Sequence, residues 1–468
     1  MVGIVSYGAY VPLWRLSRTA INPRAKGEKA ICSFDEDSTT MAVAATIDCL
    51  DGIERNTVDG LFYATTSSLY IEKMGAPTVA LASDLRKDIT TADFGNSLRG
   101  GTCGLKAALD AVKAGSAKKV ALVASDCRMG VPRTMLDEIC GDGAGALLIG
   151  DEDAVAVVEE SYSVSDEIVD IWRASGDTFL RYWEDRFTSV EGYLRVVGEA
   201  VSGLMAKTNY GPADFAKAVF YTPDGRKVAQ AAKTLGFDIK SQVQDPFYEV
   251  MGNTGTAYPI MLLIAALEEA KPGDRILLVS YGNGSDAFVL QVTESIERMK
   301  SRRGMKRHLE SKRVISDYLQ YLRWREILPN DRKRESVEFI SAPAIWRERE
   351  ANFSLRGVKC KDCGAVQYPP QRVCATCKTK DHFESYRFAE KRAEILTYSM
   401  DYIESTPEPP TVTTTIDFEG GGRMECYMTD RDISEIEVGL PVEMSFRKLG
   451  FVDGIHNYFW KSIPIRTD

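Results

Sequence analysis

The sequence predicts an α/β fold made of two similar halves, with helices layered over both faces of the strands, followed by a metal-binding module and a small β-barrel. The first observation is a pair of parallel segments, residues 100–125 and 252–280. The second is a C-x2-C pair that is repeated after ten residues, and the third is a run of short alternating segments behind it. Together these patterns predict the order of the domains.

The two parallel segments are GGTCGLKAALDAVKAGSAKKVALVAS and GNTGTAYPIMLLIAALEEAKPGDRILLVS. Each contains a glycine turn, an apolar helix of about four turns, a break and a buried strand. Each is followed by a glycine-rich, acid-containing turn into another apolar strand, at residues 141–151 and 281–292. Continuous apolar strands such as VALVA and ILLVS are typical of sheets that helices cover on both faces. The pattern predicts an internal duplication.

Composition narrows the class of protein. At 468 residues the chain is long enough for two or three domains, and 44% hydrophobic with 27% charged residues is typical of a soluble globular protein. The net charge of −9 argues against a general nucleic-acid binder. No segment reaches the roughly 18 apolar residues of a membrane span, and the N-terminus lacks the pattern of a signal peptide. We therefore expect a cytoplasmic protein with reduced thiols.

The histidines exclude one kind of chemistry. The chain has three, His308, His382 and His456, so residues 1–307 contain none. A Cys–His or Ser–His pair is therefore impossible within the duplicated region.

A basic segment follows the duplication. Residues 298–313 hold eight Lys or Arg against one Glu, which is typical either of a phosphate-binding surface or of a solvated helical connector. We favour the second and predict a basic helical connector over residues 294–335, after a duplicated domain over residues 1–293.

The last third of the chain is expected to contain a structural zinc site. The segment KCKDCGAVQYPPQRVCATCK has the spacing of two zinc knuckles, whose four thiolates would hold one Zn²⁺ with no open coordination position. The predicted ligands are Cys360, Cys363, Cys374 and Cys377, in a zinc ribbon over residues 336–380. Short alternating stretches such as TVTTTIDF and VEMSFRKL then predict a β-barrel over residues 381–468.

Five motifs resemble those of the thiolase superfamily, specifically its 3-hydroxy-3-methylglutaryl-CoA synthase branch. They are GGT at 100–102, GDGAGA at 141–146, RFTSVEGY at 186–193, GNTGTA at 252–257 and SYGNGSDAF at 280–288. The tail from SAPAIWRERE onward resembles the zinc-ribbon and OB-fold proteins that accompany thiolases. The resemblance implies a layered αβαβα fold, a coenzyme A thioester as substrate, at least a homodimer, and a separate thiolase as a possible partner.

The residues that the family uses for catalysis are replaced here. The resemblance implies a Cys nucleophile in a pattern like A-C-x-G-G-T, but this frame places Leu98 there. It implies a His in a pattern like F-H-x-P, where this chain has Tyr221 in FYTP, and an acid in a pattern like S-E-S, where this chain has Thr66. A hydrocarbon side chain cannot be acylated, so the elbow is kept without its nucleophile.

Two other residues remain candidates for a nucleophile. Cys103 lies near a helix N-terminus, which lowers a thiol pKa, but it is more than one turn beyond Leu98 and is better interpreted as a buried small side chain. Ser97 is adjacent to Leu98 but has no His to activate it.

The remaining polar residues predict a pocket for the thioester. The resemblance implies that Asn253 helps form an oxyanion site, aided by the helix N–H groups that follow it. We predict Tyr221, Asn253 and Tyr281 as catalytic residues. The predicted substrate-binding residues are Leu98, Gly101, Thr66 and Gly255.

The resulting hypothesis is an aldolase, a lyase that cleaves a β-hydroxyacyl-CoA by retro-aldol chemistry or runs the reverse condensation. It resembles the steroid side-chain aldolases in needing no acyl-enzyme, with Tyr221 as the base and Asn253 stabilising the enolate. The alternatives are a synthase-like acyltransferase or condensing enzyme, and a non-catalytic acyl-CoA-binding scaffold that partners a thiolase.

Overall fold

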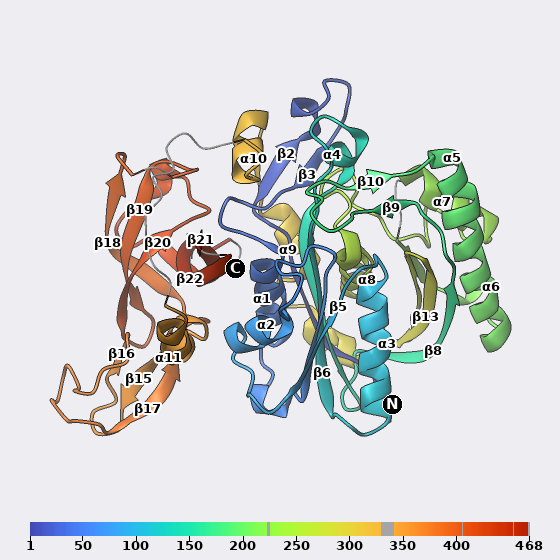
Figure 1. The fold of residues 1–468 in the computed structure, drawn as a ribbon. Helices are drawn as coiled ribbons and strands as arrows, with labels where there is room; N and C mark the ends of the chain where they lie inside the picture. The colour runs from blue at the N-terminus through green and yellow to red at the C-terminus, as the bar shows by residue number, and fades with distance from the viewer. Residues whose placement is uncertain (222–224, 329–340, 405, 453, 467–468) are drawn as a thin grey trace. The chain divides into compact units, whose positions relative to one another are not determined.

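The computed structural model describes residues 1–221, 225–328, 341–404, 406–452 and 454–466. The chain forms two compact units (Figure 1). The first contains Met1–Cys32, Asp37–Ala80 and Leu85–Tyr318, and the second contains Ser33–Glu36, Leu81–Asp84 and Leu319–Asp468.

The first unit is built on a nine-stranded sheet. Its strands, in spatial order, are β11 (Lys217–Phe220), β12 (Arg275–Tyr281), β13 (Gly284–Val292), β8 (Ala156–Ser165), β1 (Gly3–Tyr10), β7 (Asp142–Gly150), β6 (Lys119–Cys127), β4 (Gly60–Ala64) and β5 (Thr90–Phe94). In one half β4 and β6 are parallel, and β6 turns back into antiparallel β7. In the other half β11 and β12 are parallel, and β12 turns back into antiparallel β13. This topology confirms the predicted duplication.

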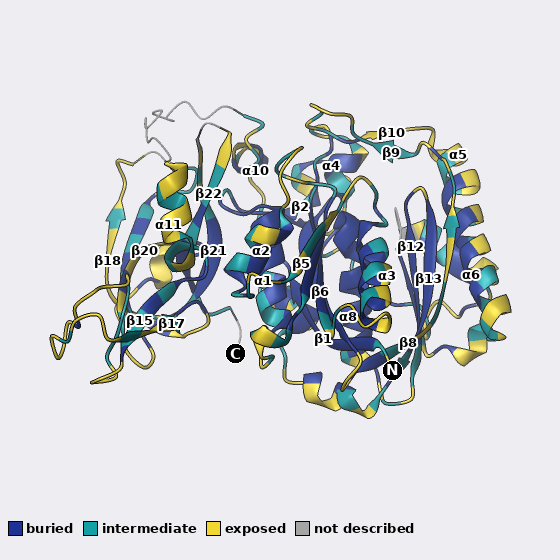
Figure 2. Ribbon diagram, turned by 60° about the horizontal axis from the view of Figure 1, so that its bottom comes forward, coloured by how far each residue is buried: buried dark blue, intermediate teal, exposed yellow. Residues whose placement is uncertain are grey.

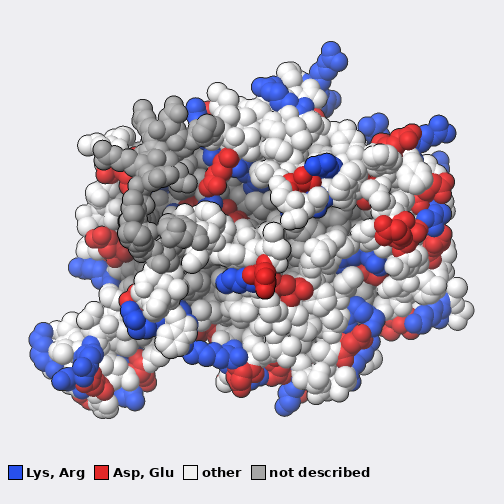
Figure 3. All heavy atoms as spheres, in the orientation of Figure 1, with Lys and Arg blue, Asp and Glu red and all other residues white. Residues whose placement is uncertain are grey.

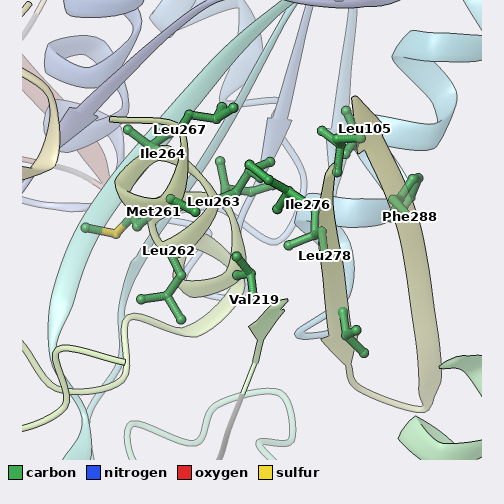
Figure 4. Close-up of a cluster of buried hydrophobic side chains, with 14 of the residues drawn as sticks. Leu105, Val219, Met261, Leu262, Leu263, Ile264, Leu267, Ile276, Leu278 and Phe288 are labelled. Atoms are coloured by element: carbon green, nitrogen blue, oxygen red, sulfur yellow. The ribbon is translucent and has the colours of Figure 1, made fainter. Parts of the chain in front are cut away.

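Two helices fill the space between the halves of the twisted sheet (Figures 1 and 2). They are α3 (Gly100–Lys113), which packs on β4 and β6, and α8 (Tyr258–Glu269), which packs on β7, β11 and β12. Helix α8 is buried from Tyr258 to Leu267, as expected for a helix that is apolar on all sides. Its leucine and isoleucine side chains lie in one core with those of the neighbouring strands (Figure 4).

Other helices cover the outer faces of the sheet. Helix α1 (Ser38–Cys49) packs on β1, β6 and β7, and Asp37 caps it by accepting hydrogen bonds from two backbone N–H groups. Helix α6 (Arg195–Thr208) packs on β8 and β13 and buries Val197, Val201 and Leu204. With the two halves of the nine-stranded sheet as separate layers, the order helix, half-sheet, helix, half-sheet, helix is the predicted αβαβα layering.

Shorter elements complete the first unit. The helices are α2 (Ala76–Ala82), α4 (Met135–Ile139), α5 (Asp185–Phe187), α7 (Gly225–Thr234) and a π-helix, η3 (Thr188–Leu194). Single 3-10 turns are η1 (Arg18–Ala20), η2 (Arg55–Thr57), η4 (Pro212–Asp214), η5 (Gly255–Ala257) and η6 (Glu294–Met299), and the strands β9 (Ile171–Trp172) and β10 (Arg181–Tyr182) form a small hairpin.

The basic segment differs from the predicted connector. Helix α9 (Gly304–Glu310) packs on β1 and α8, and β14 (Arg313–Ile315) pairs with β2 (Trp14–Ser17), which in turn pairs with β3 (Glu28–Ala30). Up to Tyr318 the segment therefore belongs to the first unit. Its arginines explain the difference, since Arg298 and Arg302 donate hydrogen bonds to the carbonyls of Val5 and Asp48 at 2.8 and 2.9 Å. Residues 329–335 of the prediction lie outside the described residues.

The second unit contains the predicted ribbon and barrel. After α10 (Tyr318–Trp324) and α11 (Ala342–Asn352), the strands β15 (Arg356–Cys360), β16 (Val366–Gln367) and β17 (Phe383–Arg387) form a three-stranded sheet. The closed barrel consists of β18 (Ala393–Asp401), β19 (Thr411–Phe418), β20 (Arg423–Met428), β21 (Pro441–Val452) and β22 (Ile455–Pro464), with the turn η7 (Ile433–Glu435). Buried residues alternate with half-buried ones along β19 and with exposed ones along β20, as the sequence predicted for a barrel.

Within the described residues, none of the helices combines the length and the hydrophobicity that crossing a bilayer requires. On the face of the molecule in Figure 3, Lys and Arg side chains of the first unit are interspersed with Asp and Glu. Among the described residues that this view shows, the basic side chains form no continuous stripe.

Candidate active site

The candidate site lies where strands from both halves end. Thr66 follows β4, Tyr221 follows β11, and Tyr281 is the last residue of β12. Asn253 and the turn η5 precede α8, and a backbone bridge joins Asn253 to Cys140 of the other half. The duplication thus brings residues from distant segments to one edge of the sheet.

Three buried side chains form the polar centre of the site. The amide Nδ2 of Asn253 donates to the hydroxyl of Tyr221 at 3.2 Å, and its Oδ1 accepts from Nη2 of Arg128 at 3.2 Å. The backbone N–H of Gly255 donates to the same Oδ1 at 2.9 Å. Asn253 therefore links the Tyr221 phenol to a buried guanidinium.

The environment of Tyr221 favours its protonated form. Burial raises the pKa of its phenol to about 12, while the charge of Arg128 and the hydrogen bond from Asn253 act in the opposite direction. At neutral pH the phenol is therefore protonated. The raised pKa opposes the base role that we expected for Tyr221 and favours a hydrogen-bond donor.

A buried carboxylate, Asp126, organises the loop where the family's acid was expected. It accepts hydrogen bonds from the hydroxyls of Thr65, Thr66 and Ser67 at 3.1, 2.8 and 2.9 Å. It also accepts from the backbone N–H groups of Thr66 and Thr256 at 2.7 and 2.8 Å. Thr66 is thus brought to the site, where both its hydroxyl and its N–H bind Asp126.

Neither Asp126 nor Arg128 was predicted from the sequence. The available signal was the charged pair in Ser-Asp-Cys-Arg, at the end of the buried strand β6. Both side chains are buried, at 0% and 4% exposure, although charged residues are rarely buried without a partner.

The two predicted glycines allow close packing. A side chain on Gly255, whose φ is +65°, would lie 2.2 Å from Oδ2 of Asp126. A side chain on Gly101 would lie 2.7 Å from the carbonyl of Thr256, and the Gly101 N–H donates to the Thr256 hydroxyl at 2.8 Å. Because neither glycine has a side chain, the two halves can pack closely at these positions. A part for either glycine in substrate binding stays a prediction.

Leu98 lies between β5 and α3, and its side chain is buried. Its side chain faces the backbone of Gly282, since a Cβ on that glycine would lie 3.0 Å from the Leu98 Cβ. Next to it, Arg99 donates to the Gly282 carbonyl at 2.8 Å and pairs with Asp286 at 3.1 Å. These bonds hold the elbow against the turn between β12 and β13.

The two alternative nucleophiles are not activated. The Ser97 hydroxyl donates to the Gly282 carbonyl at 3.1 Å. Burial raises the pKa of the Cys103 thiol, and the nearby Asp286 raises it further. Both environments oppose a nucleophilic role.

Three tyrosines surround Tyr221. The ring of Tyr281 stacks on it with centroids 6.4 Å apart, and burial together with Asp170 raises the pKa of Tyr281, whose hydroxyl donates to that carboxylate at 2.8 Å. The hydroxyl of Tyr193 donates to the Tyr221 carbonyl at 2.8 Å, and that of Tyr258 donates to the Pro246 carbonyl at 2.6 Å. Tyr281 lies beside Tyr221 with its hydroxyl bound to Asp170, and a catalytic role for it stays a prediction.

The four ribbon cysteines converge in the second unit. Their sulfur atoms all lie within 4.8 Å of one another, with Cys360 to Cys377 and Cys363 to Cys374 each at 3.6 Å. Four thiolates in this arrangement fit a tetrahedral Zn²⁺ and leave it no open position.

Comparison with protein families agrees with this description of the second unit. Residues 347–382 match the family model described as the ChsH2 rubredoxin-like zinc ribbon domain, and residues 386–447 match that of the ChsH2 C-terminal OB-fold domain.

The remainder of the chain resembles a set of synthases. It is 32% identical to the hydroxymethylglutaryl-CoA synthase of Methanopyrus kandleri over 70% of this chain and 98% of the relative. It is 34% identical to that of Archaeoglobus fulgidus over 69% of this chain and 98% of the relative. Among solved structures, MvaS in complex with 3-hydroxy-3-methylglutaryl coenzyme A matches with a TM-score of 0.62 at 19% identity, covering 70% of this chain and 92% of that one. These relatives agree better with the condensing-enzyme alternative than with an aldolase, and the chain belongs to the hydroxymethylglutaryl-CoA synthase family, with the thiolase-like fold.

Proposed function

We propose that the first unit catalyses an aldol-type carbon–carbon bond reaction on an acyl-CoA, in the direction of condensation, without a covalent acyl-enzyme. The observation that carries this proposal is the pairing of two features. The Tyr221–Asn253–Arg128 network is fully built, whereas the elbow presents Leu98 instead of a group that could be acylated. The coenzyme A thioester is inferred from the relatives, one of which is named as a complex with 3-hydroxy-3-methylglutaryl coenzyme A.

In this reaction the α-carbon of the thioester loses a proton and attacks the carbonyl carbon of a second substrate. A carbon–carbon bond forms, and the carbonyl oxygen takes up a proton to become the β-hydroxyl. Negative charge passes through the thioester oxygen as the enolate forms. No oxidant or reductant is needed, and cleavage of the β-hydroxyacyl-CoA is the same path in reverse.

Tyr221 is proposed to donate a hydrogen bond to the thioester oxygen as this charge develops. A phenol with its pKa raised to about 12 stays protonated through the neutral range, which suits a donor. Arg128, linked through Asn253, places a fixed positive charge behind it in a buried site, where electrostatic stabilisation is strong. The roles expected from the sequence are thereby changed, since Tyr221 stabilises the enolate and Asn253 positions Tyr221.

The direction of condensation is supported by the relatives, which are named as synthases. A lyase would use the same site, and it would differ only in starting from the β-hydroxyacyl-CoA instead of from the two smaller substrates. Acyl transfer through Cys103 has less support, because burial raises the pKa of its thiol.

The test is a panel of acyl-CoA thioesters, each offered with aldehydes and ketones and analysed for new β-hydroxyacyl-CoA by mass spectrometry. Matching β-hydroxyacyl-CoAs are offered alone and analysed for a released aldehyde or ketone. A new β-hydroxyacyl-CoA from at least one pair supports the proposal, whereas cleavage with no condensation product would favour the lyase alternative. Binding of coenzyme A thioesters with no product across the panel would contradict it and would favour the scaffold alternative.

A homodimer is proposed for the first unit, and a separate thiolase remains a possible further partner. Strand β5 lies at the end of the sheet order and is partly exposed along its length, so it can pair with a second copy. Light scattering at micromolar concentration is expected to give twice the chain mass, and a monomer would contradict the pairing.

A further inference from the structure

A second group of metal-binding side chains lies in the first unit, far in sequence from the ribbon. Cys32 follows β3, Cys127 is the last residue of β6, and Asp142 is the first residue of β7. Cys127 and Asp142 face each other as partners in the β6–β7 pairing. One ligand atom from each of the three lies within 4.8 Å of the other two.

The spacing of these thiols is nearly that of the zinc ribbon. The sulfur atoms of Cys32 and Cys127 are 3.5 Å apart, whereas the two ribbon pairs are each 3.6 Å apart. A fourth soft donor is close, since Sδ of Met41 lies 3.6 Å from the Cys32 sulfur. Two thiolates and one carboxylate form a donor set that Zn²⁺ accepts, and thiolate sulfur favours thiophilic ions over magnesium or calcium.

The surrounding hydrogen bonds hold these ligands in place. The backbone N–H of Cys32 donates to Oδ2 of Asp142 at 2.8 Å, and the N–H of Cys127 donates to the Ser67 hydroxyl at 3.1 Å. Hydrogen bonds of this kind to the ligating residues orient a metal site before the ion arrives. Cys32 and Asp142 are buried, whereas Cys127 is half-buried and offers a path of entry.

We propose that Cys32, Cys127 and Asp142 form a second site for a thiophilic divalent cation, for which Zn²⁺ is the probe. Binding would release the two thiol protons to solvent and neutralise charge in a buried place. Cys127 stands between Asp126 and Arg128, so a bound ion would anchor the backbone that carries both charged groups of the candidate active site. The site does not depend on which reaction that active site catalyses.

The test counts ions in the full chain. Reduced protein is incubated with Zn²⁺, desalted and analysed for zinc per chain. Wild type is expected to hold two ions, Cys127→Ser one, and Cys363→Ser in the ribbon one. Cys49→Ala is the matched control, because this buried thiol lies 3.6 Å from the Ser6 carbonyl, and it is expected to retain two. Co²⁺ replaces Zn²⁺ in a parallel titration, where thiolate-to-metal absorption should lose one component in each of the two site variants.

One ion per wild-type chain, unchanged in Cys127→Ser, would overturn the proposal. A disulfide between Cys32 and Cys127 would also overturn the proposal. It would appear as a mass two hydrogens below that of the reduced chain in protein isolated without oxidant, and this deficit would be absent in Cys32→Ser. Where Cys363→Ser fails to fold by circular dichroism, the wild-type and Cys127→Ser counts decide the result alone.

Discussion

The zinc ribbon and the candidate active site both gather ionisable groups, but they balance the charge differently. In the ribbon four cysteines surround a place for an ion that must come from outside the chain. In the active site the positive charge is Arg128, which is part of the chain, and Asp126 is surrounded by five hydrogen-bond donors. The first arrangement depends on a metal for its stability, and the second is complete in the folded protein. Removing the ribbon zinc should therefore affect only the first.

The largest expected effect is loss of the ribbon zinc. Structural zinc contributes on the order of 10 kcal/mol to the folding of such small modules. Cys360→Ser should unfold the ribbon, seen as fast hydrogen exchange over residues 347–382. Strands β4, β6, β11 and β12 should keep their protection. Equal loss of protection in those strands would contradict the comparison.

The next effect concerns the built-in charge. Arg128→Gln removes the buried guanidinium that donates a hydrogen bond to Asn253. Breaking such a network lowers the free energy of unfolding by about 3–5 kcal/mol. Thermal unfolding of the first unit should shift accordingly, with turnover lost as well. Arg128→Lys keeps the charge but not the planar fork, so it should restore part of the stability. An unchanged melting temperature in Arg128→Gln would show that the guanidinium does not hold the site together.

Tyr221→Phe sharpens the comparison within the site. It removes one donor and leaves the packing of the ring, so coenzyme A binding should persist while turnover falls about 10²- to 10³-fold. Tyr258→Phe is the matched control, since its hydroxyl donates to the Pro246 carbonyl and its ring contacts Tyr221 edge-on. Steady-state rates of the two variants are compared on the same substrate. Equal losses in both would remove Tyr221 from the mechanism.

The pH profile separates a donor from a base. With its pKa raised to about 12, a Tyr221 that acts as a protonated donor should give no rise in rate between pH 7 and 10 from this group, with a fall only as pH approaches 12. If Tyr221 acted as a base, the rate would instead rise about tenfold with each unit of increasing pH until the pH reached its pKa. The rates of wild type and Tyr221→Phe are measured against pH on a substrate that the wild type turns over. A slope that is present in wild type and absent in the variant belongs to Tyr221.

The smallest effect on turnover is expected at the elbow. Leu98→Ala removes a buried hydrocarbon and should cost about 2–3 kcal/mol of stability, as core truncations do. Turnover at saturating substrate should change by less than about tenfold, because Leu98 carries no proton and no charge. A loss as large as that of Tyr221→Phe would mean that the elbow takes a direct part in the reaction.

The sequence predicted what is local and repeated. The ribbon ligands lie within one short segment of the chain. Each of the two units of glycine turn, helix and strand is also one uninterrupted segment, so both patterns can be recognised without knowledge of the fold. Arg128 and Asp126 escaped because their partners, Asn253 and the Thr65–Ser67 loop, are distant along the chain and meet only when the halves assemble. The contacts of the basic segment up to Tyr318 escaped for the same reason, since the carbonyls that Arg298 and Arg302 bind belong to remote residues.

In the proposed reaction the acyl group stays on coenzyme A and is never bound covalently to the first unit. The most direct measurement is the intact mass of the protein during turnover. The protein is mixed with a thioester substrate that it converts, quenched in acid within the first turnover, and weighed. We expect only the mass of the unmodified chain while product accumulates, because Leu98 has no nucleophilic group and burial raises the pKa of the Cys103 thiol, which disfavours the reactive thiolate. A chain heavier by one acyl group, formed and consumed at the rate of turnover, would contradict the account.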